Sequence, residues 1–188
     1  VANRTVNGKQ HTVTWHVDDL KSTHEDPKVN DDFHIWCEKI YGSDKVGHVK
    51  VVRGKVHDYL AMILDFSTPG ALKLDMKYYI RNMVEEFQYA IKAIKTTPWT
   101  EKLFKVNSES KNLDEERRGV FHTFVMKAMF LCKRARPDVN PAIGFLSSRV
   151  KEPNEGDWNK LQKVLGFLKG TIEDVLTLEA DDTQTMMC

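Results

Sequence analysis

The strongest constraint on the fold is a β-hairpin signal near the beginning of the sequence. Asn7-Gly8 is typical of a type I′ turn, because both central residues of that turn need a positive φ. Residues 12–17 are β-branched or aromatic apart from one histidine, which is the composition of a strand. Residues 4–17 are therefore predicted to form an antiparallel hairpin, whose second strand leads into the adjacent carboxylates Asp18 and Asp19.

A helix and a second hairpin are predicted in the next part of the chain. Asp26-Pro27 combines a favoured N-cap residue with proline at the first helical position, and Gly42 is expected to end this helix. Residues 49–52 and 59–66 have the composition of strands, and residues 72–74 are expected to close a hairpin through a turn at 68–70. Asp75 is expected to cap another helix. The apolar faces of the two helices are Val29, Phe33, Trp36, Cys37 and Ile40, and Tyr79, Ile80, Met83, Val84 and Phe87.

The second half of the chain has a different pattern. Residues 99–113 are polar and weakly patterned, and are predicted to be a linker. Helices are expected to begin near Asp114, Pro141 and Asp157, and the last of them to end near Gly170. No strand is expected in this half, and the tail 172–188 is short and polar. The fold class is therefore α+β, with hairpins and helices in residues 1–98 and a helical unit in residues 114–171.

Composition narrows the protein class only partly. The chain has 188 residues, 41% of them hydrophobic, and a net charge of +1, which indicates a globular protein without a global electrostatic signature for nucleic acid. Cys37, Cys132 and Cys188 lie far apart without zinc-ligand spacing, so reduced thiols are expected. No signal peptide or membrane-length apolar run is present in the sequence. A chain that begins with Val1 is expected to be a fragment or a processed product.

Asp18 and Asp19 are the candidate metal ligands. Adjacent carboxylates at the end of an apolar strand repel each other and resist desolvation, and a divalent cation relieves both problems. Mg²⁺ takes one or two carboxylates together with substrate phosphates, and a pair of such ions can promote phosphoryl transfer. The alternative is a solvated loop after a strand. Two other Asp-Asp pairs, at 31–32 and 181–182, do not follow an apolar strand.

Several segments resemble motifs of one enzyme class. Residues 15–20 resemble the (Y/F)-V-D-D box of reverse transcriptases, with His16 in place of tyrosine. Other segments resemble motifs of the copia-type class and follow in the same order. Tyr59-Leu60-Ala61-Met62 resembles its F-L-G-hydrophobic strand, Tyr79-Ile80 with Phe87 resembles its Y-I-x-x-L-L-x-x-F helix, and Thr97-Pro98 resembles its T-P. Leu131 with Arg136-Pro137-Asp138-Val139 resembles its L-x-x-x-T-R-P-D-I segment, and Trp158 with residues 164–171 resembles its H-W-x-x-x-x-R-V-L-R-Y-L-K-G-T segment. The ordered succession spans about residues 12–171, and the chain resembles the reverse transcriptase of copia-type LTR retrotransposons.

The resemblance implies an RNA-directed DNA polymerase. Residues 1–98 would be the C-terminal part of the palm, 99–113 a linker, 114–171 a thumb-like unit and 172–188 a tail toward an RNase H region. Asp18 and Asp19 would be catalytic and would bind Mg²⁺ in a two-ion site, completed by an aspartate missing from this chain. His16, Val17, Tyr59 and Leu60 would lie near primer and template. Without an N-terminal part, the chain is expected to be inactive.

The resemblance also implies partners and a location. The expected partners are an RNA or DNA template, a DNA primer, dNTP and the rest of the Pol polyprotein, with its fingers, RNase H and integrase, and no membrane. The location would be a cytoplasmic virus-like particle. The alternative is a non-catalytic retrotransposon remnant or a nucleic-acid-binding module that keeps the palm-thumb fold.

One further group of residues has two interpretations. Lys127, Lys133, Arg134 and Arg136 cluster around one predicted helix end, either as phosphate contacts or as partners of the helix dipole on a solvated face. The four tryptophans, Trp15, Trp36, Trp99 and Trp158, are expected mostly in the core.

Overall fold

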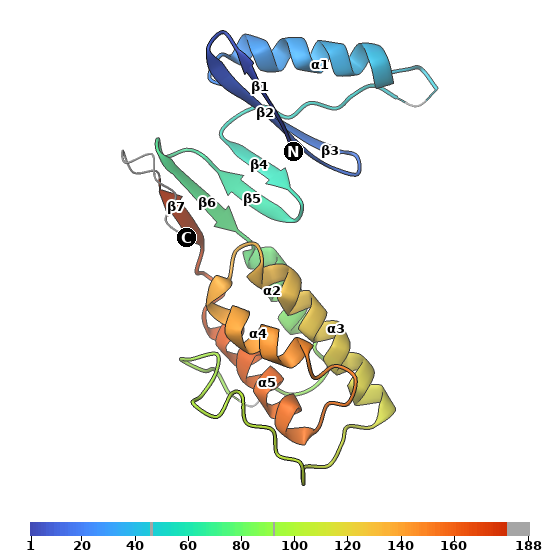
Figure 1. The fold of residues 1–188 in the computed structure, drawn as a ribbon, viewed down its shortest axis with the longest axis vertical. Helices are drawn as coiled ribbons and strands as arrows, with labels where there is room; N and C mark the ends of the chain where they lie inside the picture. Colours follow the sequence, from blue (N-terminus) through green and yellow to red (C-terminus); the bar gives the residue numbers. More distant parts are fainter. Residues whose placement is uncertain (46, 92, 180–188) are drawn as a thin grey trace. The chain divides into compact units, whose positions relative to one another are not determined.

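The computed structural model describes residues 1–45, 47–91 and 93–179, and it separates into two compact units, Val1–Leu60 and Ala61–Cys188 (Figure 1). The predicted α+β class is confirmed, because both sheets are antiparallel and helices accompany them. The division between the units lies at residues 60 and 61, whereas the sequence placed it in the linker 99–113.

The first unit begins with a three-stranded antiparallel sheet. Its strands are β1 (Ala2–Val6), β2 (Lys9–His16) and β3 (Asp19–Thr23), in the order β1-β2-β3. Asn7 and Gly8 connect the first two strands with φ angles of 52° and 75°, which are the signs that a type I′ turn requires. The first predicted hairpin is therefore confirmed.

Helix α1 (Pro27–Tyr41) follows the sheet and has the predicted ends. The Asp26 carboxylate accepts a hydrogen bond from the backbone N–H of Lys28 at 2.9 Å, and Gly42 is the C-cap. The expected burial of its apolar face is only partly correct. Val29 and Cys37 are buried, whereas Trp36 is 51% exposed. The described residues 49–52 form no strand, so that prediction is wrong.

The predicted strand over residues 59–66 is interrupted by a turn. Strand β4 (Val56–Tyr59) ends the first unit and strand β5 (Met62–Asp65) opens the second. Between them, Leu60 and Ala61 have φ angles of 53° and 61°. This left-handed conformation normally belongs to glycine or asparagine, so the residue types at these two positions do not predict a turn.

Ala61→Gly is expected to stabilise the protein by about 1 kcal/mol. The left-handed conformation costs a Cβ-bearing residue roughly 1–2 kcal/mol, and the greater backbone entropy of glycine offsets only part of that gain. Urea unfolding of both proteins measures the difference. Ala2→Gly is the matched control because Ala2 lies in extended backbone, where glycine is expected to be neutral or destabilising. A less stable Ala61→Gly protein would contradict the assignment of strain.

The second unit has its own antiparallel sheet, in which β5 pairs with β6 (Ala71–Asp75) and β6 pairs with β7 (Leu176–Glu179). The expected β5–β6 hairpin is confirmed. Strand β7 contradicts the expectation that the second half of the chain contains no strand. Leu176 and Leu178 do alternate with polar residues, but four residues are too few for a clear period-two signal. Residues 180–188, which include Asp181-Asp182 and Cys188, lie outside the described residues.

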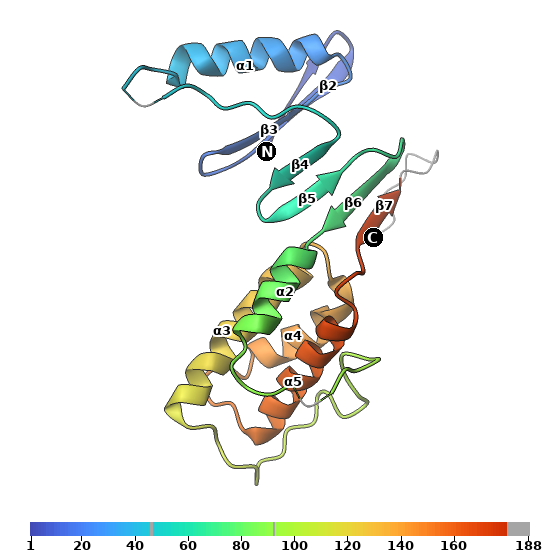
Figure 2. The same cartoon turned by 180° about the vertical axis from the view of Figure 1, so that it is seen from behind.

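Four α-helices form the body of the second unit (Figure 2). They are α2 (Lys77–Glu86), α3 (Glu115–Cys132), α4 (Asn140–Ser147) and α5 (Glu155–Gly170), with a short 3₁₀ helix, η1 (Pro137–Val139), before α4. Asp114 caps α3 as predicted, since its carboxylate accepts a hydrogen bond from the N–H of Arg117 at 2.8 Å. The core between the helices includes Ile80, Phe121, Leu131, Ile143, Leu146, Leu161 and Leu165, all fully buried.

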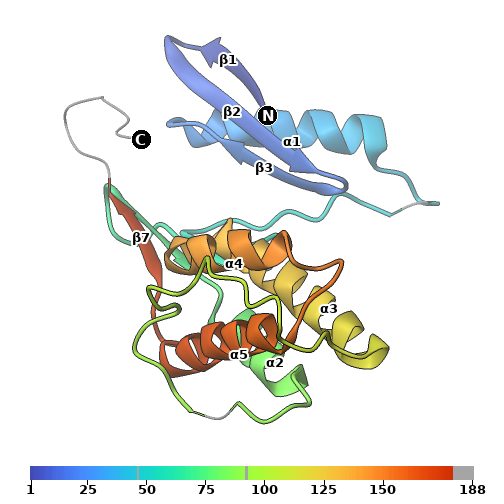
Figure 3. The same cartoon turned by 60° about the horizontal axis from the view of Figure 1, so that its bottom comes forward.

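Residues 99–113 contain no helix or strand, but they are anchored to the second unit rather than free (Figure 3). The Leu113 N–H donates to the Pro153 carbonyl at 2.9 Å, and the Lys160 ammonium donates to the Lys105 carbonyl at 2.7 Å. Leu103 is buried within the unit. The predicted linker is therefore a long loop that packs against the start of α5.

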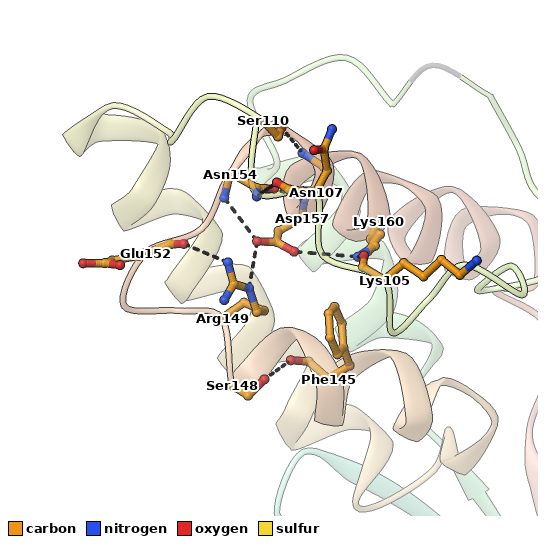
Figure 4. A network of polar contacts seen from close by, with 11 residues as sticks. Lys105, Asn107, Ser110, Phe145, Ser148, Arg149, Glu152, Asn154, Asp157 and Lys160 are labelled. Atoms are coloured by element: carbon orange, nitrogen blue, oxygen red, sulfur yellow. Dashed lines mark hydrogen bonds and ion pairs between the residues drawn. The ribbon is translucent and has the colours of Figure 1, made fainter.

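A buried carboxylate fixes the N-terminus of α5 (Figure 4). The Asn154 side chain accepts from the Asp157 N–H at 3.0 Å, and Asp157 Oδ2 accepts from the Asn154 N–H at 3.2 Å, which together make a capping box. Arg149 Nε donates to the same Oδ2 at 3.1 Å, and Lys160 Nζ lies 3.8 Å from Oδ1. Asp157 thus joins the loop before α5 to the first turn of the helix.

Candidate metal-binding turn

Asp18 and Asp19 lie at the turn between β2 and β3. His16 is the cross-strand partner of Asp19, so Val17 and Asp18 are the two central residues of a two-residue hairpin loop. The strand before the pair ends at His16, two residues earlier than the aspartates, and Asp19 begins the next strand. The two carboxylates therefore come from adjacent positions of a tight turn.

Val17 has an unusual backbone conformation in this turn. Its φ is 54° and its side chain is 87% exposed, although a β-branched residue is a genuine outlier in that region. Apart from Asn7, the described non-glycine residues with positive φ are Val17, Leu60 and Ala61. All three of these residues lie in the two turns that carry predicted site residues, and backbone strain of this kind clusters at functional sites.

The environment of the two carboxylates differs from the expectation. Asp18 and Asp19 are both exposed, so water rather than a cation relieves most of their repulsion. Within the part of the chain that the structure describes, no group of three or more His, Cys, Asp or Glu side chains could hold a metal ion. Two exposed carboxylates still suit one Mg²⁺ ion that keeps waters or phosphate oxygens as its other ligands, but they do not make a two-ion site.

The hairpin presents two different faces next to the turn. His16 and Asp19 form one cross-strand pair, and Trp15 and Leu20 form the next, so the two pairs point to opposite faces. His16 is exposed and can hydrogen-bond to a ligand near the carboxylates. Trp15 and Leu20 line a cavity of about 550 Å³ between the sheet and α1, with Val13, Phe33, Trp36 and Tyr41. The tryptophans were expected mostly in the core, and no signal in the sequence predicted this cavity.

The structure brings together four of the six predicted site residues. His16, Val17, Asp18 and Asp19 belong to one hairpin end. The other two lie at the second turn, Tyr59 as the last residue of β4 and Leu60 after it. Both are half-buried. Residues 59–62 were expected to lie in one strand, whereas a turn at Leu60 and Ala61 divides them between β4 and β5.

The basic cluster at the end of α3 is largely engaged within the protein. Arg136 is 3% exposed and donates to Asp138 and to the carbonyl and hydroxyl of Thr171. The Lys127 ammonium pairs with Glu86, and the Arg134 guanidinium lies 3.5 Å from the centre of the Phe130 ring. These contacts favour a structural role for the cluster over phosphate binding.

Comparisons with known proteins give no family for this chain. No family model matches the sequence, and no solved structure matches the fold. Within the described residues, no helix is both long enough and apolar enough to cross a membrane. The residues of the chain therefore carry the functional argument.

Proposed function

We propose that this chain is part of an RNA-directed DNA polymerase of the copia retrotransposon type, with Asp18 and Asp19 as ligands of a catalytic Mg²⁺ ion. Residues 1–98 would then belong to the palm and residues 114–171 to the thumb. The reaction is the transfer of a nucleotide from dNTP to the 3′-hydroxyl of a primer, with release of pyrophosphate. Template, primer and the remaining Pol polyprotein are the partners in this proposal.

The position of the carboxylate pair is the observation that carries the proposal. The resemblance implies an Asp-Asp pair at the turn of a palm hairpin; Asp18 is the second residue of the two-residue loop between antiparallel β2 and β3, and Asp19 is the first residue of β3. The exposure of the pair leaves room for a phosphate chain and a primer terminus to approach. The positive φ of Val17 is the conformation that a two-residue hairpin loop requires at its first central residue, and it keeps the carboxylates at the end of the hairpin.

The side chains of the turn have separate roles in the proposed reaction. When bound, Mg²⁺ supplies positive charge to the transferring phosphate. Asp18 and Asp19 hold the ion through carboxylate oxygens, and the rigid two-residue turn fixes their position. His16, which pairs with Asp19 across the hairpin, can donate a hydrogen bond to the primer or stack on it. A third carboxylate from outside these residues completes the two-ion site in this proposal.

The isolated chain is expected to show no primer extension with Mg²⁺. Two carboxylates do not position two Mg²⁺ ions. The attacking oxygen of the primer and the leaving oxygen of the pyrophosphate would therefore not both be stabilised in the transition state. The assay uses a labelled DNA primer on RNA and DNA templates. Robust extension by residues 1–188 alone would contradict the incomplete-site account.

A non-catalytic remnant or nucleic-acid-binding module is the second candidate. No third metal-binding side chain lies around Asp18 and Asp19 among the described residues, and this observation agrees with both candidates. The genomic sequence immediately upstream distinguishes the candidates. An open reading frame with an aspartate on an apolar strand supports the polymerase, whereas a disrupted frame supports the remnant.

A further inference from the structure

A buried histidine links all three strands of the first sheet to α1. His11, on β2, is 2% exposed. Its Nδ1 lies 3.1 Å from Arg4 Nε on β1, and its Nε2 lies 2.8 Å from the Ser22 hydroxyl on β3. That hydroxyl lies 2.7 Å from Asn30 Oδ1 on α1. The four side chains therefore form one continuous chain of hydrogen bonds.

The donors in this chain fix the charge state of His11. Arg4 Nε can only donate, so His11 Nδ1 must accept and therefore carries no proton. His11 Nε2 then carries the proton and donates to Ser22, whose hydroxyl donates in turn to Asn30. A doubly protonated imidazole would place an N–H against the Arg4 N–H. Only neutral His11 satisfies all of these bonds.

His24 repeats this pattern at the start of α1. The Asp26 N–H donates to His24 Nδ1 at 2.9 Å, so His24 Nε2 carries the proton and donates to the Val6 carbonyl at 3.2 Å. Asp26 is the N-cap of α1 and Val6 is the last residue of β1. The two imidazole rings lie 6.0 Å apart, edge to face. Both histidines thus join the sheet to the first part of α1.

The surroundings of His11 oppose its protonation. Arg4 faces it from β1 and His24 faces it from the segment after β3, while α1 contributes the apolar ring of Phe33. Asp32 of α1 lines the same cavity. Burial lowers the pKa of His11 below its ordinary value, and the Arg4 and His24 charges lower this pKa further.

The C-terminal part of α1 buries only part of its apolar surface. Ile35, Ile40 and Tyr41 are each more than half exposed, whereas Cys37 is buried and Glu38 accepts a hydrogen bond from the Val49 N–H at 2.7 Å. We propose that His11 is the centre of a proton-operated latch, which holds α1 on the three-stranded sheet when its ring is neutral and releases the helix when the ring is protonated. Release would open the cavity lined by Trp15 and Trp36.

The pH range of the latch follows from linkage. The pKa of His11 is lowered in the folded protein, so the unfolded or released state takes up the proton first as the pH falls below the ordinary value of 6.5. The attachment of α1 is therefore intact above that pH. It weakens progressively between the ordinary pKa and the lowered one, and stays weak below it.

Hydrogen exchange of the full chain tests the latch. Amide exchange is measured at pH about 7.5 and about 5.5, corrected for intrinsic rates, and exchange of α5 serves as the internal reference. Exchange in α1 is expected to rise several-fold relative to α5 at the lower pH. The variant His11→Gln/His24→Gln can still donate from its amides but cannot titrate, so its α1 is expected to lose the pH dependence. His122→Gln is the control, because His122 is exposed on α3.

Two outcomes would overturn the latch. One is equal relative exchange of wild-type α1 at both pH values, and the other is an unchanged pH dependence in the double variant. If the double variant does not fold, an NMR titration of the wild-type imidazoles decides instead. A His11 pKa at or above 6.5 would refute the proposal, whereas a lower pKa that coincides with loss of α1 protection would support it.

Discussion

Asparagine in place of Asp18 or Asp19 is expected to lower nucleotidyl transfer about 10³-fold in a polypeptide that carries the complete site. Asparagine keeps the size of the side chain but removes the charge that binds Mg²⁺, and a metal ion contributes several kcal/mol to the stabilisation of a phosphoryl transition state. Both side chains are exposed in the hairpin turn, so the substitutions are expected to leave stability nearly unchanged. Steady-state primer extension measures the activity.

Asp32→Asn is the matched control for this experiment. Asp32 also belongs to an adjacent aspartate pair and is exposed, but it lies within α1. Its substitution removes the same charge without touching the turn, and full activity is expected. Equal losses for Asp32 and Asp19 would indicate a general charge effect and would argue against a metal site at the turn.

Asp157→Ala is expected to destabilise the second unit by about 3 kcal/mol. The carboxylate is 1% exposed, and its loss removes half of a capping box together with the Arg149 ion pair. Breaking a buried pair costs roughly 3–5 kcal/mol, because the remaining charge stays desolvated; the partial exposure of Arg149 and Lys160 places the expected cost at the lower end. Thermal or urea unfolding followed by circular dichroism gives the value.

Asp157→Asn distinguishes the contribution of the helix cap to stability from that of the ion pair. The amide oxygen can still accept from the Asn154 N–H but no longer pairs with Arg149, so an intermediate loss is expected. Asp174→Ala is the exposed control in the same unit and should change stability by less than about 0.5 kcal/mol. A loss below about 1 kcal/mol for Asp157→Ala would show that Asp157 does not anchor α5.

The sequence predicted those elements whose ends carry a chemical signal. Asn7-Gly8 set the first hairpin and Asp26-Pro27 the start of α1, because the side chains themselves determine these backbone conformations. The turn between β4 and β5 had no such signal in its residue types. Leu60 and Ala61 are poor turn residues, and the structure shows them in left-handed conformation. The pairing of neighbouring strands, rather than local preference, sets such a turn.

Pairing between strands far apart in the sequence was also not predictable. Strand β7 pairs with β6, about a hundred residues earlier in the chain, and a four-residue strand has too short a pattern to detect. The loop 99–113 was read as a linker because its polar residues form no periodic pattern. Its backbone instead bonds to the residues around the start of α5.

Burial of the tryptophans could be predicted only in part. Trp158 is buried as expected, at 3% exposure, whereas Trp15 and Trp36 are about half exposed. Period and residue type indicate which face of an element is apolar, but they do not tell whether another element covers that face. For the candidate site, the sequence predicted a strand that leads into the carboxylate pair, but it did not predict β3, which follows the pair and forms a second hairpin with β2. It did not predict the exposure of the pair or the strain at Val17.

The most direct test of the central claim is the response of the turn to Mn²⁺, a paramagnetic substitute for Mg²⁺. Substoichiometric Mn²⁺ is added to the ¹⁵N-labelled chain, and broadening of each backbone amide signal is recorded. We expect residues 16–20 to broaden first, well before the Asp31-Asp32 pair and α5, and we expect Asp18→Asn/Asp19→Asn to remove this selectivity. Broadening that is absent from the turn, or equal at the other aspartate pair, would contradict the assignment of Asp18 and Asp19 as metal ligands.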